Sequence, residues 1–280
     1  VAGSLGYSAL VASAPLLVLF YLLGVKRKPS WVAGLSALAV AAMVALAVYG
    51  MPVRQAVAAT LYGAAFGLFP IGWIVFTAIL LYKMAVETGK FEIIKDSVGA
   101  LSADRRLQAL LIAFSFSAFI EGAAGFGTPV AVAAAMLAGL GFSPFYAAVI
   151  CLLGNTSPVA YGSIGTPIVM LSGITGIPSL PLSAMSGRIL SIISVIVPMY
   201  LVVVMAGTRG ALAVAPAILA CGVTFGAVQL AVSNLIGHEL TAILASLASM
   251  GAMVLVMRWW HPAEIFRLEG DAPAAAAPRR

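Results

Sequence analysis

The feature of this sequence that most restricts its fold is a long stretch, Leu107 to Gly187, in which Glu121 is the single Asp, Glu, Lys, Arg or His. Two apolar runs within it are interrupted by glycine and proline where a helix would otherwise continue. The first interruption reads EGAAGFGTP, from Glu121 to Pro129, and the second reads GNTSPVAYGSIGTP, from Gly154 to Pro167. Because glycine and proline both destabilise the interior of a helix, the pattern predicts two broken helices with a lone acid beside the first.

The composition indicates that these helices lie in a lipid bilayer. Hydrophobic residues make up 62% of the chain and charged residues 9%, against roughly 45–50% and about 25% in soluble domains. The net charge of +6 comes from basic residues in short loops beside apolar spans, not from one patch with interleaved aromatics, so we expect no nucleic-acid partner. Two cysteines without CxxC spacing support neither a metal site nor a disulfide framework, and we expect no cofactor.

The apolar runs predict an all-α polytopic membrane protein with about seven transmembrane helices plus a re-entrant hairpin with broken helices. Runs of about 20 residues can cross the hydrocarbon as helices, and the predicted full spans are about Ser8–Val25, Ser30–Tyr49, Leu61–Lys83, Arg188–Ala206, Ala211–Leu235 and Leu240–Met257. Pieces too short to cross alone are Leu107–Ile120, Pro129–Leu140, Pro144–Leu153 and Pro167–Ile174. We predict an interfacial segment at Lys83–Arg106, a transmembrane domain over residues 1–267 and a disordered Ala/Pro tail or linker over 268–280.

The distribution of basic residues predicts the orientation of the chain. With the N-terminus outside and the C-terminus cytoplasmic, all of the 15 Lys and Arg residues except Arg54 and Arg188 fall on the inner side, as the positive-inside rule requires. The region from Leu107 to Gly187 must then cross an odd number of times. One arrangement that does so is a re-entrant hairpin with its tip at Glu121–Pro129 followed by a spanning helix broken at Asn155–Pro167.

The two breaks are the candidate binding site. Thr128-Pro129 and Thr166-Pro167 each combine a possible capping oxygen with a proline suited to the first helical turn, so both predict helix starts. A helix that begins inside a membrane presents free N–H groups and a positive dipole end, which favour an anion, and transporters with broken helices bind carboxylates near the bilayer midplane in this way. The candidate substrate-binding residues are Gly122, Gly125, Gly127, Thr128, Asn155, Thr156, Ser157, Tyr161, Ser163 and Thr166.

Glu121 is the candidate proton carrier. Burial disfavours a charged carboxylate, so protonation would neutralise it and let the loaded site change its exposure. A structural acid bonded to the glycine-rich turn is the alternative interpretation. The chain is not predicted to be an enzyme, because no histidine lies near a candidate serine and His238 and His261 fall at opposite ends of the last span.

The motifs FIEGAAGFGTPVAV from Phe119 and LLGNTSPVAYGSIGTPI from Leu152 resemble the bacterial L-lactate permease family of lactate and glycolate proton symporters. The likeness continues in NLIGHEL from Asn234 and covers the chain to about Phe266. It implies an inner-membrane carrier of short 2-hydroxy monocarboxylates, with an inverted-repeat architecture. Family members are about twice this length, so the resemblance also implies an N-terminal half and a missing C-terminal half as its partner.

Two alternatives remain open from the residues. A sodium-coupled organic-anion transporter would hold Na⁺ with the carbonyl groups of Asn155, Thr156 and Ser157. A non-transporting membrane fragment would instead bind or assemble with a partner half.

Overall fold

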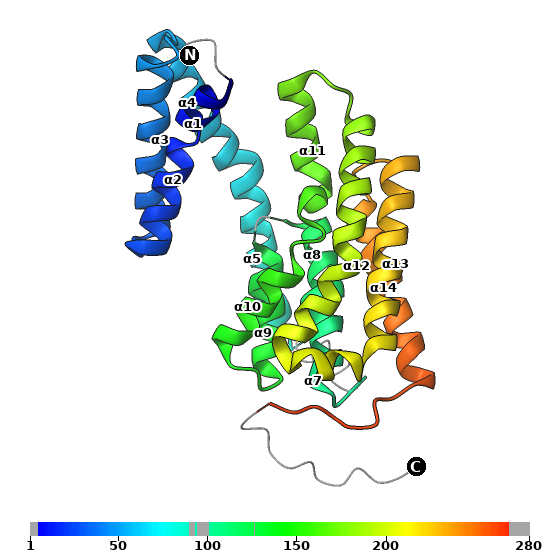
Figure 1. The fold of residues 1–280 in the computed structure, drawn as a ribbon. Coiled ribbons are helices and arrows are strands. Elements are labelled where there is room, and N and C mark those ends of the chain that lie inside the picture. The colour runs from blue at the N-terminus through cyan, green and yellow to red at the C-terminus, as the bar shows by residue number, and fades with distance from the viewer. Residues whose placement is uncertain (1–4, 90–92, 94–100, 126, 269–280) are drawn as a thin grey trace. The chain divides into compact units, whose positions relative to one another are not determined.

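The computed structural model describes residues 5–89, 93, 101–125 and 127–268. Their regular secondary structure is helical, without any strand. The chain forms two compact units, Val1–Trp73 and Ile74–Arg280, whose helices are labelled in Figure 1. Among the described residues, five helices are long and apolar enough to cross a membrane, or up to seven if each of two bent helix pairs is one span. The predicted all-α polytopic membrane fold is confirmed.

The first unit is a set of thinly packed apolar helices. It contains α1 (Leu5–Ala12), α2 (Ala14–Phe20), the π-helical turn η1 (Tyr21–Val25), α3 (Ser30–Ala47), α4 (Val53–Phe66) and the π-helical turn η2 (Gly67–Ile71). α2 packs along α3, and the Tyr49 hydroxyl donates to the Ser8 carbonyl at 2.8 Å, which joins the two ends of this hairpin. Of the side chains described in this unit, Ala33 alone is buried, so its apolar surface suits contact with lipid.

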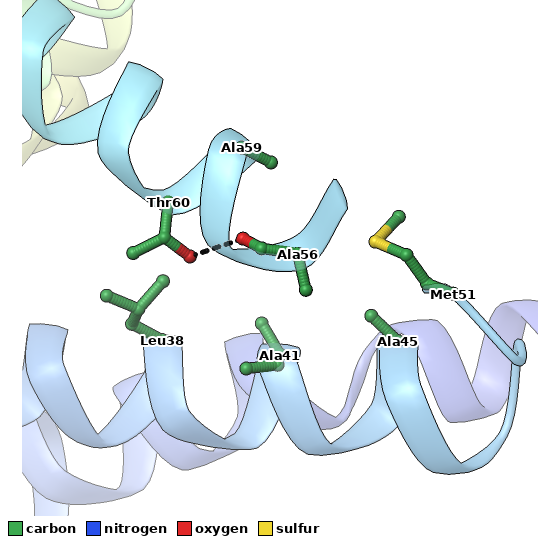
Figure 2. A pocket seen from close by; sticks show the side chains of 8 residues that line it. Leu38, Ala41, Ala45, Met51, Ala56, Ala59 and Thr60 are labelled. Carbon is green, nitrogen blue, oxygen red and sulfur yellow. Dashed lines mark hydrogen bonds between the residues drawn. The ribbon is translucent and has the colours of Figure 1, made fainter. Parts of the chain in front are cut away.

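Small side chains line the junction of α3 and α4. Figure 2 shows a pocket of about 230 Å³ between them, in which the Thr60 hydroxyl donates to the Ala56 carbonyl at 2.9 Å. The lining residues are Leu38, Ala41, Ala42, Ala45, Met51, Ala56, Ala59 and Thr60. α4 begins at Val53, earlier than the predicted start near Leu61, because Pro52 ends the preceding turn in extended conformation. α5 (Gly72–Glu87) continues from η2.

The second unit is built around one buried helix. That helix comprises α7 (Arg105–Ala109), the π-helical turn η3 (Leu110–Phe116) and α8 (Ser117–Ala123). Packed with it are α9 (Thr128–Gly139), α10 (Pro144–Gly154), the 3₁₀ turn η4 (Val159–Tyr161), α11 (Gly162–Thr175), α12 (Ser179–Leu212), α13 (Ala215–Leu235) and α14 (Thr241–Trp259). Consecutive helices α12, α13 and α14 lie side by side (Figure 1). The Phe114 and Phe225 rings meet edge to face, 5.0 Å apart, in its core.

The predicted limits of the short piece Leu107–Ile120 are wrong, because the helix extends beyond them at both ends. Asp104 caps the helix by accepting the backbone N–H of Arg106 at 2.9 Å, and the helix then runs over the 19 residues Arg105–Ala123. At 1.5 Å per residue it is about 28 Å long, enough to cross the hydrocarbon. α12 likewise begins at Ser179, before the predicted Arg188, directly after the extended residue Pro178.

One end of the second unit is held by a buried ion pair. Arg106 Nη2 lies 2.6 Å from Asp104 Oδ2, with both side chains almost fully buried. The same guanidinium donates to the carbonyls of Gly210 and Glu264, each at 2.9 Å, and Asp104 accepts the N–H of Phe266 at 3.0 Å. These bonds join the start of the buried helix, the end of α12 and the segment after α14. We call this set the clamp.

A helical hairpin is present at the predicted place, and its re-entry into the membrane stays a prediction. Arg105, the first residue of α7, donates to the carbonyl of Leu140, which directly follows α9, so α9 runs antiparallel to the buried helix and the tip of the hairpin lies between Ala123 and Thr128. The predicted interfacial segment falls partly on residues 90–92 and 94–100 and the predicted tail almost wholly on 269–280, which lie outside the described residues.

Candidate functional site

The first break separates α8 from α9 and uses glycine for its unusual backbone. Gly125 has φ +63° and Gly127 has φ +83°, in the left-handed region that glycine enters without the steric penalty of other residues. α9 begins at Thr128, as predicted. The predicted cap is wrong, however, because the Thr128 hydroxyl donates to the carbonyl of Gly125 instead of accepting a free N–H group.

The second break separates α10 from α11, whose axes are bent by 77°. Here the left-handed residues are Ser163 (φ 47°), Ile164 (φ 57°) and Gly165 (φ 75°), so regular helix resumes only after Gly165. The Thr166 hydroxyl donates to the Ser163 carbonyl at 2.7 Å. Both threonines therefore bond back to the carbonyl three residues earlier, and the second predicted cap is wrong for the same reason as the first.

The two breaks, distant in sequence, meet in space. A Cβ atom on Gly125 would lie 2.9 Å from both the Cβ and the N atom of Ser163, and a Cβ on Gly162 would collide with Oε1 of Glu121. Each glycine thus permits an approach that an alanine would block. The structure joins the lone acid of the first break to the backbone of the second.

A cavity of about 270 Å³ lies at this junction. Binding sites of drug-sized ligands usually enclose ~300–1,000 Å³, so this cavity suits a ligand of only a few heavy atoms. Of the described residues that line it, Glu121 alone is ionisable. The lining consists of Glu121, Gly127, Asn155, Val159, Gly162, Ser163 and Pro167.

Two side-chain oxygens of residues that line the cavity have no partner. The Glu121 side chain is 5% exposed, and Asn155 approaches its carboxyl group from the second break. Among the described residues, four buried side-chain oxygens lack a hydrogen-bond partner, namely Glu121 Oε2, Asn155 Oδ1, Ser117 Oγ and Ser157 Oγ, and the first two belong to the lining. Buried polar atoms are nearly always paired in proteins, so these two indicate a place for a proton, an ion, water or a polar ligand.

Neighbouring helices hold the second break in shape. Gln229 of α13, fully buried, donates to the Ser157 carbonyl at 3.1 Å and accepts a hydrogen bond from Ser194 of α12 at 2.6 Å. The Tyr161 hydroxyl donates to the carbonyl of Ser183 at 2.7 Å. These contacts fix the turn between α10 and α11 to α12 and α13.

Four of the predicted site residues line the cavity: Glu121, Gly127, Asn155 and Ser163. Others take part in packing or anchoring: Gly122 lies against α14, Gly125 against the second break, and Tyr161 is fully buried. Those absent from the lining are Gly122, Gly125, Thr128, Thr156, Ser157, Tyr161 and Thr166. Direct contact of any of them with substrate stays a prediction.

The sequence analysis did not find two of the residues around the breaks. Gln229 is an uncharged polar residue inside an apolar run, a signal that a search confined to ionisable side chains passes over. His238 was judged by its distance from His261 along the chain, whereas in the structure its ring lies against Gly165 of the second break. Arg188, one of the two basic residues predicted on the outer side, donates through Nε to Asn234 Oδ1 at 3.1 Å.

Comparison with known proteins identifies the family. The sequence model of the L-lactate permeases matches residues 8–279. The chain belongs to the L-lactate permease family. Relatives in this family include an L-lactate permease of Bacillus subtilis, 50% identical over 99% of this chain and 49% of the relative, and one of Escherichia coli K12, 43% identical over 98% and 50%.

A second kind of permease also matches. A protein named Glycolate permease GlcA of Escherichia coli K12 is 46% identical over 93% of this chain and 46% of the relative. No solved structure gives a significant match. The chain spans about half the length of the curated relatives it matches. Because the matches run over nearly the whole of this chain, they lend no support to a separate C-terminal partner, and that expectation stays a proposal.

Proposed function

We propose that this chain forms part or all of a membrane carrier for short 2-hydroxy monocarboxylates such as L-lactate and glycolate. The names of its relatives support this substrate class, and permeases are transporters rather than enzymes. The small cavity between two broken helices is the proposed binding site. Gly127 lines it beside the N-terminus of α9, where the positive end of the helix dipole favours a carboxylate.

The observation that carries the proposal is the charge of the cavity. Glu121 is the one ionisable residue among the described lining residues, and no cation accompanies it. Two negative charges about 4 Å apart repel by roughly 4 kcal/mol at an effective dielectric constant of 20. An anionic substrate therefore enters when Glu121 is protonated, so that the proton and the anion are bound together. This coupling is a symport of monocarboxylate and proton.

The proposed membrane and orientation set the direction in which the proton gradient acts. We place the chain in a bacterial inner membrane with its N-terminus outside and its C-terminus in the cytoplasm, on the basis of the Lys and Arg distribution. The proton gradient across such a membrane would drive import. The reconstitution described below tests whether a separate C-terminal half is a partner of this chain.

Sodium coupling is the second candidate, and the unpartnered oxygens of Glu121 and Asn155 favour it. These two residues offer an acidic and a neutral oxygen at one cavity, and unwound backbone in broken-helix transporters coordinates Na⁺ through oxygen atoms. Both candidates use Glu121. They differ in whether uptake needs Na⁺ or an inward proton gradient.

The test is uptake of labelled L-lactate into proteoliposomes with an acidic exterior. We expect uptake that collapses with the pH gradient, persists when Na⁺ is replaced by choline, and is inhibited by unlabelled glycolate. Loss of uptake in choline at fixed pH would show that Na⁺, and not the proton, is the coupling ion. The chain is reconstituted alone and with the remaining part of a family member. No uptake in either reconstitution, with the protein correctly inserted, would contradict the carrier proposal.

A further inference from the structure

His238 lies in the turn between α13 and α14 and covers the second break. Its side chain is 8% exposed, and the ring lies so close to Gly165 that a Cβ atom on that glycine would collide with the imidazole. Gly165 is the last left-handed residue before α11 becomes regular. The imidazole therefore packs against the residue at which the broken helix recovers its regular geometry.

The same region of the chain also supports the first break. A Cβ atom on Gly122 would lie 3.0 Å from Ala242 Cβ and 3.0 Å from Ile243 N, both in the first turn of α14. Gly122 follows the acid Glu121 directly. The α13–α14 turn and the first turn of α14 thus contact both breaks, His238 at the second and Ala242 with Ile243 at the first.

The imidazole has one charged neighbour in the described structure. His238 Nε2 lies 3.6 Å from Glu239 Oε1, and the Glu239 side chain is 54% exposed. The described residues of α11 and α13 contain no Asp, Glu, Lys, Arg or His, Glu121 is the one such residue of α8, and Arg258 is at the far end of α14. Arg188 of α12 is bonded to Asn234, at the end of α13. Protonation of His238 thus creates an attractive pair with Glu239.

We propose that His238 is a positioning residue for the monocarboxylate site and that its pairing with Glu239 makes the geometry of the second break depend on pH. The inference rests on the proposed function. With the imidazole protonated, Glu239 holds the ring in place against Gly165. With the imidazole neutral, the ring retains its packing but loses this attraction. The residue acts through the broken helix and does not touch substrate.

Variants of His238 separate packing from titration. His238→Ala removes the ring, and we expect it to raise the KM for L-lactate about tenfold at every external pH, because Gly165 loses its packing partner and the second break is no longer held in its binding geometry. His238→Phe keeps an aromatic ring of similar size, so it should keep the wild-type KM at alkaline pH and lose the part of the pH dependence that Glu239→Gln also loses. An unchanged KM in His238→Ala, or a wild-type pH profile in His238→Phe, would overturn the proposal.

A measurement without substrate distinguishes this proposal from the transport proposal. Val159 lines the cavity and is half exposed, whereas both native cysteines are buried, so Val159→Cys reports access to the cavity through its rate of alkylation by a maleimide. Variants are compared at each pH because the thiolate fraction itself rises with pH. We expect faster labelling with His238→Ala at every pH, and with His238→Phe at acidic pH only. Equal rates in all three backgrounds would contradict the positioning role even if the chain transports L-lactate.

Discussion

The two breaks have similar sequences but obtain their backbone geometry by different means. In the first, the left-handed residues among those described are glycines, Gly125 and Gly127. In the second, Ser163 and Ile164 share that conformation with Gly165, although it costs a residue with a side chain roughly 1–2 kcal/mol. The first break carries the acid beside glycines that adopt this conformation freely, and the second carries strain at residues with side chains.

The difference shows how strain at a site is maintained. Strained residues persist only where the surrounding structure over-determines them. The second break has such surroundings, because Gln229 and Tyr161 bond its turn to α12 and α13 and the His238 ring covers Gly165. In the first break, the Thr128 hydroxyl bonds within the turn itself. Substitutions can test whether charge and shape are divided between the breaks in this way.

The largest effect should come from the charged break. Glu121→Gln keeps the size of the side chain but cannot carry a proton, so we expect proton-driven L-lactate uptake to fall to background while insertion is retained. Asn155→Ala, the comparison at the second break, should raise the KM and retain uptake driven by the proton gradient. Uptake assays over a range of external pH compare the two variants. Wild-type pH dependence in Glu121→Gln would remove this residue from the coupling mechanism.

The contact between the breaks should give the next largest effect. Gly162→Ala introduces a methyl group that collides with Glu121 Oε1, and such overpacking typically lowers the free energy of unfolding by about 1–3 kcal/mol. Thermal unfolding in detergent measures the loss. In a Glu121→Ala background the collision disappears, so Gly162→Ala should there cost far less. Equal costs in both backgrounds would mean that the two breaks are not coupled through this contact.

Removing an external support should destabilise the second break. Gln229→Leu leaves the Ser157 carbonyl and the Ser194 hydroxyl without their partner, and each unpaired buried group costs about 1–3 kcal/mol. We expect lower thermal stability and a higher KM. Gln108→Leu is the control, because Gln108 is also buried and bonded but lies in α7, away from the breaks. A raised KM in both variants would show that affinity follows general stability.

The smallest effect should have the opposite sign. Ile164→Gly relieves a left-handed residue whose side chain is 54% exposed, so we expect the free energy of unfolding to rise by ~0.5–1 kcal/mol, the steric relief outweighing the entropy of glycine. Val169→Gly, at an exposed position in the regular part of α11, should lower it by about 0.5 kcal/mol. A loss of stability in both would show that Ile164 is not strained.

Local signals in the sequence were enough to locate the breaks. A lone acid, clustered glycines and two Thr-Pro pairs mark Glu121–Pro129 and Asn155–Pro167 without knowledge of any packing. The span limits were less predictable, since the helix from Arg105 includes charged residues that the clamp buries. The direction of the threonine hydroxyls and the anchoring role of Tyr161 depend on neighbouring backbone. The same holds for Gln229 and His238, whose partners come from other helices.

The clamp has a consequence for the biosynthesis of this unit. Asp104 and Phe266 are 162 positions apart in the chain, and Arg106 and Glu264 are 158 apart. Chains are made from the N-terminus, so the partners of this ion pair at Glu264 and Phe266 are synthesised only after the helices α7 to α14. Until then the charges of Asp104 and Arg106 have each other but not these backbone groups. The end of the bundle is therefore completed as the last step of its synthesis, once residue 266 has left the ribosome.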